Sequence, residues 1–266
     1  MARNKSYIKL EGTLDGLTFY EKDGQSFVRT KGGVNKNRIE NDPAFKRTRE
    51  NMQEFGGSAN VGKALRSALG TVVKLMSDSY MAARLSGIMK RINSNGPGFR
   101  GQRSFEILAN SDLLKGFELN KKDPLSTQFF APYSAPSLNA NRDVITWLVP
   151  DFDTDSFISA PEGATHCRLV LAAGLLSDYT FETALNSYEP VNEDENAIGS
   201  AEFSRDIPLK GMTGGDTTLV VDLGIGAAVA PTTATVAAIG IVFYQEINGA
   251  LYELAQGNAM KIATVG

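Results

Sequence analysis

The acidic stretch DFDTDSFISAPE is the part of this sequence whose residue spacing comes nearest to a known binding chemistry. It places Asp151, Asp153, Asp155 and Glu162 at positions 1, 3, 5 and 12 of a calcium-loop register. Carboxylate oxygens at this spacing can surround a calcium ion. Against this, Ser156 stands where the loop needs glycine, and the flanking residues are typical of strands. The sequence therefore predicts no metal site and an acidic loop between two strands, with calcium binding as the alternative.

The residues that nucleophilic catalysis would need are scarce. The single histidine, His166, and the single cysteine, Cys167, are neighbours in a run of β-formers, so their side chains should point to opposite faces of a strand. No Walker loop is present, and the stretch GPGFRG neither follows a strand nor opens a helix, as a dinucleotide site requires. One cysteine also excludes an internal disulfide and a cysteine-rich zinc site. We therefore expect no catalytic residues, no cofactor and no enzymatic activity.

Basic residues in the first half of the chain offer a different chemistry, the neutralisation of phosphates. The candidates for contact with a nucleic acid are Arg47, Arg49, Lys90, Arg91, Arg100 and Arg103. The aromatic rings of Tyr20 and Phe27 are candidates for stacking on bases. Half of the Arg and Lys residues in predicted helices lie within one turn of a carboxylate, which is also typical of a solvated helix surface. Nucleic-acid binding is therefore an alternative function.

Charge is divided unevenly along the chain although the net charge is only −3. Residues 1–115 hold 20 Lys and Arg against 11 Asp and Glu, whereas residues 116–266 hold 7 against 19. An asymmetry of this size indicates either a first half that binds a polyanion or head-to-tail attraction between copies of the chain.

A β-ribbon near the N-terminus is the first element that must position these residues. The runs LTFYEK and QSFVRTK are rich in β-formers and are separated by Asp23-Gly24, a strong signal for a two-residue hairpin turn. The register of that turn predicts apolar side chains on both faces of the ribbon. Two strands by themselves cannot bury both faces from water. Either the helices that follow or another copy of the protein must cover it. The predicted assembly interface consists of Leu17, Phe19, Tyr20, Phe27, Val28 and Arg29.

Helical patterns follow the ribbon. Asp42 and Pro43 are typical of a helix start, and Gly56-Gly57 of its end, with an apolar stripe between them that includes Met52 and Phe55. Two further helices are predicted over residues 60–76 and 80–93. The stretch from residue 93 to residue 104 reads as a glycine-rich basic loop.

From about residue 124 the pattern changes to some seven short runs of β-formers separated by turn residues. The least polar run, GIGAAVAPTTATVAAIGIVF, contains Pro231 and is built of small and β-branched residues, so we interpret it as buried strands and not as a membrane span. Trp147 falls in a predicted strand, where a core position is expected, with a carbohydrate or protein ligand for this region as a weaker reading. The sequence predicts an α+β protein. It has a β-ribbon and helices in residues 1–120 and an Ig-like antiparallel β-sandwich in residues 121–266.

Several stretches resemble a group of uncharacterised proteins that recur in Bacteroidetes-type bacteria. They are EGTLDGLTFYEKDGQSFVRTKGG, DPAFKRTRENMQEFG, LLKGFELN, APEGATHCRLV and GIVFYQEINGALYELAQG. The resemblance covers nearly the whole chain and implies no activity. The order of ribbon, Asp-Pro and Arg-rich helix is also similar to small structural proteins of phage-like elements.

These patterns together favour a structural subunit. We expect a non-enzymatic homo-oligomer that assembles through its N-terminal ribbon and helices, head-to-tail, into a ring, filament or virion-like particle. The stretch MARNKSYIKLEG lacks the apolar run of a secretory signal, so the expected location is the cytoplasm or an assembled particle or filament.

Overall fold

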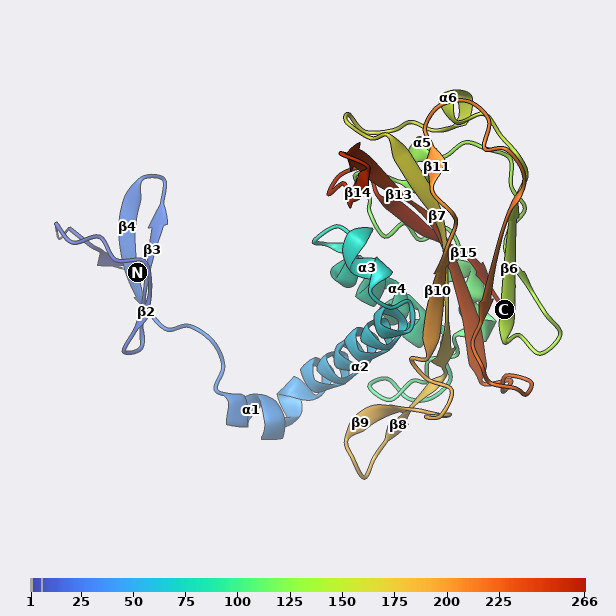
Figure 1. Ribbon diagram of the computed structural model, residues 1–266. Coiled ribbons are helices and arrows are strands. Elements are labelled where there is room, and N and C mark those ends of the chain that lie inside the picture. The colour runs from blue at the N-terminus through green and yellow to red at the C-terminus, as the bar shows by residue number, and fades with distance from the viewer. Residues whose placement is uncertain (1, 6) are drawn as a thin grey trace. The chain divides into compact units, whose positions relative to one another are not determined.

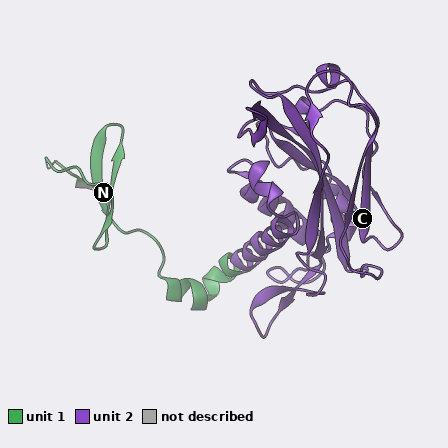
Figure 2. Cartoon of the chain, in the orientation of Figure 1, with its two compact units in different colours: residues 1–49 green, residues 50–266 purple. Residues whose placement is uncertain are grey.

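The computed structural model describes residues 2–5 and 7–266, and the chain divides into two compact units, residues 1–49 and residues 50–266 (Figure 1, Figure 2). The sequence predicts a boundary after residue 120, but the structure divides the chain after Arg49. The physical reason is that the helices beyond residue 50 bury their apolar side chains in the same core as the C-terminal strands. The helical residues beyond position 50 therefore belong to the second unit.

Four short strands form the sheet of the first unit. They are β1 (Ala2–Arg3), β2 (Gly12–Leu14), β3 (Leu17–Lys22) and β4 (Gln25–Thr30), in the order β1-β4-β3-β2. β3 and β4 pair antiparallel around Asp23 and Gly24, whose φ angles of 53° and 71° lie in the left-handed region that a type I′ turn needs. The register sets Tyr20 opposite Phe27, the facing pair that this turn predicts.

Two short helices follow this sheet, α1 (Lys36–Asn41) and the 3-10 helix η1 (Pro43–Phe45). Asp42 caps η1, because its side chain accepts a hydrogen bond of 2.9 Å from the N–H of Ala44, and Pro43 takes the first position. These are the roles that the sequence predicts for Asp42 and Pro43 at a helix start.

The helices of the second unit are α2 (Lys46–Ala68), α3 (Val72–Leu75) and α4 (Met81–Asn95). The predicted helix end at Gly56-Gly57 is wrong, because α2 runs through both glycines. Gly57 lies so close to the ring of Tyr188 that a Cβ there would be 2.4 Å from the ring carbon Cδ2. Packing against an aromatic ring, and not a turn, therefore accounts for this glycine.

A long antiparallel sheet forms the centre of the second unit. Its strand order is β10 (Gly199–Phe203), β7 (His166–Ser177), β13 (Thr233–Ile247) and β14 (Ala250–Glu253), with β11 (Ile207–Pro208) also on β7 and β15 (Ala259–Val265) also on β13. β7 and β13 pair from Ser177 with Thr233 to His166 with Tyr244. β13 is buried from Thr233 to Tyr244, which confirms that this part of the least polar run is buried strand.

Side chains alternate between the two faces of this central sheet and enter two cores. On one face Val170 and Ala172 of β7 pack in a core with Leu65 of α2 and Leu85 of α4. On the other face Leu171 shares a second core with side chains of a three-stranded sheet. That sheet has the order β12 (Thr217–Asp222), β6 (Val144–Val149) and β5 (Ser137–Leu138). The protein is therefore of the α+β class with antiparallel sheets, and α2 and α4 pack on one face of the central sheet while the three-stranded sheet packs on the other (Figure 1).

Further short elements connect these layers. They are η2 (Leu108–Leu113), α5 (Leu125–Gln128), α6 (Thr154–Phe157) and the two-stranded hairpin of β8 (Tyr179–Glu182) and β9 (Ser187–Pro190). β8, β9 and β15 lie outside the runs of β-formers that predict strands in the sequence. Asn248 and Gly249, with φ angles of 53° and 82°, form the two-residue turn between β13 and β14. Asn-Gly is a strong sequence signal for such a hairpin turn, as Asp23-Gly24 is in the first unit.

Candidate functional site

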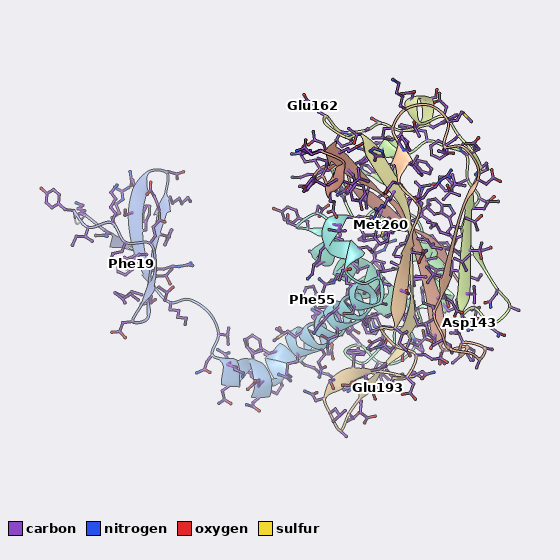
Figure 3. The ribbon with its side chains drawn as sticks, in the orientation of Figure 1. Phe19, Phe55, Asp143, Glu162, Glu193 and Met260 are labelled. Carbon is purple, nitrogen blue, oxygen red and sulfur yellow. The ribbon has the colours of Figure 1, made fainter. Side chains whose placement is uncertain are left out.

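The residues predicted as an assembly interface lie on β3 and β4 of the first unit. The rings of Tyr20 and Phe27 stack on one face, with centroids 5.7 Å apart and planes at 21°. The guanidinium carbon of Arg29 lies 5.4 Å from the centroid of the Tyr20 ring, a distance typical of a cation–π contact. Phe19, which Figure 3 labels, faces Val28 on the other side of the sheet. Each face therefore carries apolar side chains.

The first unit has almost no interior of its own. Among residues 3–5 and 7–49, Ser26 is the only one whose side chain is buried. Six large apolar side chains of this unit are at least 40% exposed, namely those of Tyr7, Ile8, Leu10, Leu14, Leu17 and Val34. A small sheet needs an apolar face packed against another layer to be stable. Within its own unit this sheet has little apolar packing, and its apolar side chains are open to contact with another surface.

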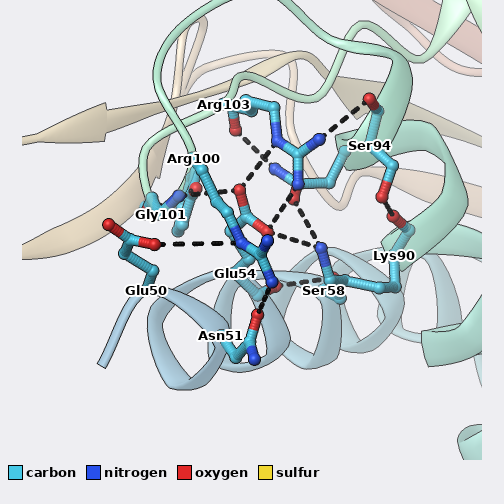
Figure 4. A network of polar contacts seen from close by, with 11 residues as sticks. Glu50, Asn51, Glu54, Ser58, Lys90, Ser94, Arg100, Gly101 and Arg103 are labelled. Atoms are coloured by element: carbon cyan, nitrogen blue, oxygen red, sulfur yellow. Dashed lines mark hydrogen bonds and ion pairs between the residues drawn. The ribbon is translucent and has the colours of Figure 1, made fainter. Parts of the chain in front are cut away.

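A buried carboxylate organises the basic loop of the second unit (Figure 4). Glu54 of α2 is 0% exposed and accepts hydrogen bonds from Lys90 at 2.5 Å, from the N–H of Gly101 at 2.8 Å and from Arg103 at 2.8 Å and 2.9 Å. Ser58, one turn further along α2, donates to the backbone carbonyl of Glu54 at 2.6 Å. These bonds fold the glycine-rich loop predicted over residues 93–104 onto α2.

The charge of Glu54 is held by these contacts. Burial alone would raise the pKa of this carboxyl, but the hydrogen bonds from Arg103, Lys90 and Gly101 outweigh burial and lower the pKa to about 2. The same pairing raises the pKa of Arg103. Glu54 is therefore ionised at neutral pH, and it is paired with Lys90 of α4 and with Arg103 of the loop that follows.

The structure brings together only some of the residues predicted to contact a nucleic acid. Lys90 and Arg103 bind Glu54, and Arg100 donates to Asn51 and lies 3.8 Å from Glu50. In the first unit, Arg49 donates to the carbonyls of Ile39 and Asp42. Arg47 and Arg91 are exposed. Three of the six side chains thus hold a loop in place, and nucleic-acid binding stays a prediction.

Sequence reasoning misses Glu54 although a signal for it is present. Along α2 the buried residues Glu54, Ser58, Val61 and Leu65 recur at intervals of four and three, the spacing of one helix face. The predicted helix end at Gly56 separates Glu54 from the other three residues, so this spacing is not recognised. In contrast, Met52 and Phe55 of the predicted apolar stripe are 60% and 62% exposed. Figure 3 labels Phe55 on α2.

The carboxylates of the calcium-loop register do not converge on one point. Asp151 accepts from the hydroxyl of Thr213 at 2.5 Å and from the N–H of Gly214 at 2.9 Å, while Asp155 accepts from the N–H of Gly211 at 2.9 Å. Asp153 caps α6. Glu162 is exposed in the loop before β7. Within residues 2–5 and 7–266 no group of three or more His, Cys, Asp or Glu residues is arranged to hold a metal ion. Asp151 and Asp155 instead bind the loop of residues 211–214.

The other candidates for chemistry are in the core or separated from one another. Cys167 is buried, and burial raises the pKa of its thiol to about 12, which disfavours the reactive thiolate at neutral pH. His166 is partly exposed and accepts or donates a hydrogen bond of 3.0 Å with Thr165. Trp147 is 0% exposed and packs edge-on against Phe129, so it offers no platform for a sugar ring.

A search for membrane-spanning helices and three comparisons with known proteins add little to this geometry. In the described part of the chain, no helix combines the length and apolar character that crossing a membrane requires. The resemblance to uncharacterised Bacteroidetes-type proteins and to phage-like structural proteins stays a prediction. Searches against protein-family models, curated proteins and solved structures find no match for this chain.

Proposed function

We propose that this chain is a non-enzymatic structural subunit that assembles with copies of itself through the sheet of its first unit, into a ring, filament or virion-like particle. The observation that carries this proposal is that the sheet has apolar side chains on both faces and a single buried side chain, that of Ser26, among residues 3–5 and 7–49. The stacked pair of Tyr20 and Phe27 forms the centre of one face, with Arg29 beside it. Aromatic and arginine side chains are the residues that contribute most to protein–protein interfaces.

Charge supports contact between unlike surfaces of two copies. The first unit holds 11 Lys and Arg against 6 Asp and Glu, and the second holds 16 against 24. The net charges are therefore +5 and −8. When the basic first unit of one copy binds the acidic second unit of the next, the contact is head-to-tail, and such contacts close into rings or extend into filaments.

We further propose that the central sheet and the three-stranded sheet form an Ig-like β-sandwich, which would project from such an assembly. Trp147 of β6, Leu171 of β7 and Phe243 of β13 lie in one core between the two sheets, which supports this proposal. An experimentally determined structure whose strand connections differ from the Ig-like order would contradict it.

The oligomeric state of the full chain tests the assembly proposal. We expect native mass spectrometry and electron microscopy at about 50 mM salt to find oligomers that dissociate as salt rises toward about 500 mM, because charge attraction between surfaces is screened. The double substitution Tyr20→Ser with Phe27→Ser should shift the population to monomers. The matched control is Tyr252→Ser, which removes a 56% exposed ring from β14 of the second unit and should leave the oligomers intact.

Hydrogen exchange separates two ways of covering the sheet. Oligomers with slow amide exchange in β3 and β4, lost in the double variant, support the proposal. A monodisperse monomer that does not respond to salt and still has slow exchange in β3 and β4 overturns it, since the chain would then cover its own sheet.

A further inference from the structure

A hollow of about 740 Å³ opens where α2 ends and α4 begins, in the second unit. Its lining comes from residues 63–82, and its volume lies within the range of about 300 to 1,000 Å³ that is usual for small-molecule sites. Val73 and Met81 contribute its apolar floor, and both side chains are less than 10% exposed. The hollow therefore combines space for a small molecule with apolar side chains in its lining.

Three basic side chains line this hollow, those of Lys63, Arg66 and Lys74. None of them has a carboxylate within 4.0 Å in the described part of the chain, unlike Lys90 and Arg103 in the Glu54 cluster. Arg66 uses its Nε to donate to the carbonyl of Gly62 at 3.2 Å, which leaves its remaining guanidinium donors for another acceptor. The positive charge at this place is thus not neutralised by the protein.

The one carboxylate among the lining residues, that of Asp78, already has partners within the protein. It pairs with Arg84 at 2.8 Å and accepts from the N–H groups of Tyr80 and Lys121, both at 2.8 Å. Burial would raise its pKa, but these contacts outweigh burial and lower the pKa of Asp78. Because Arg84 balances Asp78, the three free basic side chains set the sign of the charge in the hollow.

Further donors surround these basic side chains. The hydroxyls of Ser67, Thr71 and Ser79 are part of the lining. α4 begins without a side-chain cap, and the N–H group of Ala82, a lining residue in its first turn, has no acceptor among the described residues. Free N–H groups and the helix dipole both favour an anion at this end of a helix. Cationic, hydroxyl and backbone donors from two helices and their connection therefore meet around an apolar floor.

We propose that this hollow binds a small molecule that carries a phosphate group on an apolar or aromatic body. Lys63, Arg66 and Lys74 neutralise the phosphate, since a guanidinium and ammonium groups are the usual phosphate partners in proteins. Val73 and Met81 contact the body of the ligand. The site lies entirely within the second unit, so it does not depend on how the first unit assembles.

Isothermal titration of the full chain with adenosine monophosphate, inorganic phosphate and adenosine tests the proposal. At about 50 mM salt we expect one saturable site for adenosine monophosphate, weaker binding of inorganic phosphate and no binding of adenosine. Arg66→Gln and the double substitution Lys63→Gln with Lys74→Gln should each weaken binding by about tenfold or more, because a hydrogen bond to a charged group is lost. The control Lys210→Gln removes an exposed positive charge outside the hollow and should leave the affinity unchanged.

The thermal unfolding midpoint of each variant verifies that the fold is kept. Equal loss of affinity in Lys210→Gln and Arg66→Gln overturns the proposal, since net charge alone would then explain binding. Absence of saturable binding of adenosine monophosphate and phosphate, or binding of single-stranded DNA without binding of the mononucleotide, overturns it as well.

Discussion

Glu54 and Arg103 form a two-pronged ion pair across 49 positions of the sequence, with Nε donating to Oε1 at 2.8 Å and an Nη to Oε2 at 2.9 Å. Glu54 has no exposed side-chain surface, whereas Arg103 is 23% exposed. A carboxylate that is removed from water keeps its charge only where several donors replace the lost hydration. The pair therefore links the loop after α4 to α2 and makes both segments depend on one side chain.

Replacing Glu54 with glutamine should strongly destabilise the second unit. The substitution leaves Lys90 and Arg103 next to a neutral amide, and breaking a buried ion pair on one side costs about 3 to 5 kcal/mol. Urea denaturation of Glu54→Gln measures this loss. Glu50→Gln, one turn earlier on α2 and next to Arg100 at 3.8 Å, is the matched control and should have a clearly smaller effect. Equal losses would mean that the cluster does not anchor the loop.

Stability should fall at acidic pH through the same residue. The pKa of Glu54 is lowered from its ordinary value of 4.5 to about 2, so the folded state binds this proton less readily than the unfolded state. Its contribution is fully present above a pH of 4.5 and is lost as the pH falls toward about 2. A shift of this size corresponds to about 3 kcal/mol. Denaturation between these pH values should show this slope in the natural chain and not in Glu54→Gln.

Asp178 should contribute with the opposite sign. Burial raises the pKa of its carboxyl, more than the hydrogen bond from the N–H of Ile107 lowers it, and the nearby charge of Glu106 raises it further. The folded state therefore binds this proton more readily, and the contribution of Asp178 to stability rises as the pH falls toward its ordinary value of 3.8. Asp178→Asn keeps an acceptor for Ile107 without the buried charge. We expect this variant to be more stable than the natural chain at pH 7 and to lose that advantage in acid, and a lower stability at pH 7 would contradict the assignment.

Calcium should leave the thermal stability unchanged. Asp151 and Asp155 accept hydrogen bonds from residues 211–214, and together with Asp153 and Glu162 they form no metal-holding group in the described chain. A ligand that binds only the folded state would raise the unfolding midpoint in proportion to its concentration. Differential scanning calorimetry with millimolar calcium and with chelator should therefore give the same midpoint. A higher unfolding midpoint in calcium would contradict this prediction and support calcium binding, which the spacing of these carboxylates suggests.

Local signals in the sequence predict the hairpins with two-residue turns better than the strand pairings that depend on distant segments. Asp23-Gly24 and Asn248-Gly249 place two hairpins because the left-handed backbone of their turns depends on the turn residues alone. β15, in contrast, follows Gly257-Asn258 but pairs with β13, which comes before β14 in the chain, so no short hairpin turn sets this pairing. The hairpin of β8 and β9 is likewise stabilised by packing, since Tyr188 lies against Gly57 of α2. Contacts between distant segments leave no short-range pattern to read.

The same limit applies to the candidate sites. Arg100 and Arg103 read as free basic residues because their carboxylate partners lie about 50 positions away on α2, beyond the reach of any spacing rule. Lys63, Arg66 and Lys74 have no such partners, but only the turn between α2 and α4 brings them around one hollow. Residue type therefore predicts which interactions a side chain can make. The fold decides whether a basic side chain is paired with a carboxylate of the same chain or is available to a ligand.

Two neighbouring glycines of α2 should respond in opposite ways to alanine. At Gly57 a Cβ would lie 2.4 Å from Cδ2 of Tyr188, and this ring is fixed by its hydroxyl, which donates to the carbonyl of Gly101 at 3.2 Å, and by edge contacts with Phe105 and Phe181. At Gly56 no atom lies within 4 Å of the added carbon. Gly56→Ala should therefore stabilise the protein by about 0.5 to 1 kcal/mol through helix propensity, while Gly57→Ala should destabilise it by about 1 to 3 kcal/mol through overpacking. Chemical denaturation of the two variants measures both effects, and stabilisation by Gly57→Ala would mean that the helix does not pack on Tyr188.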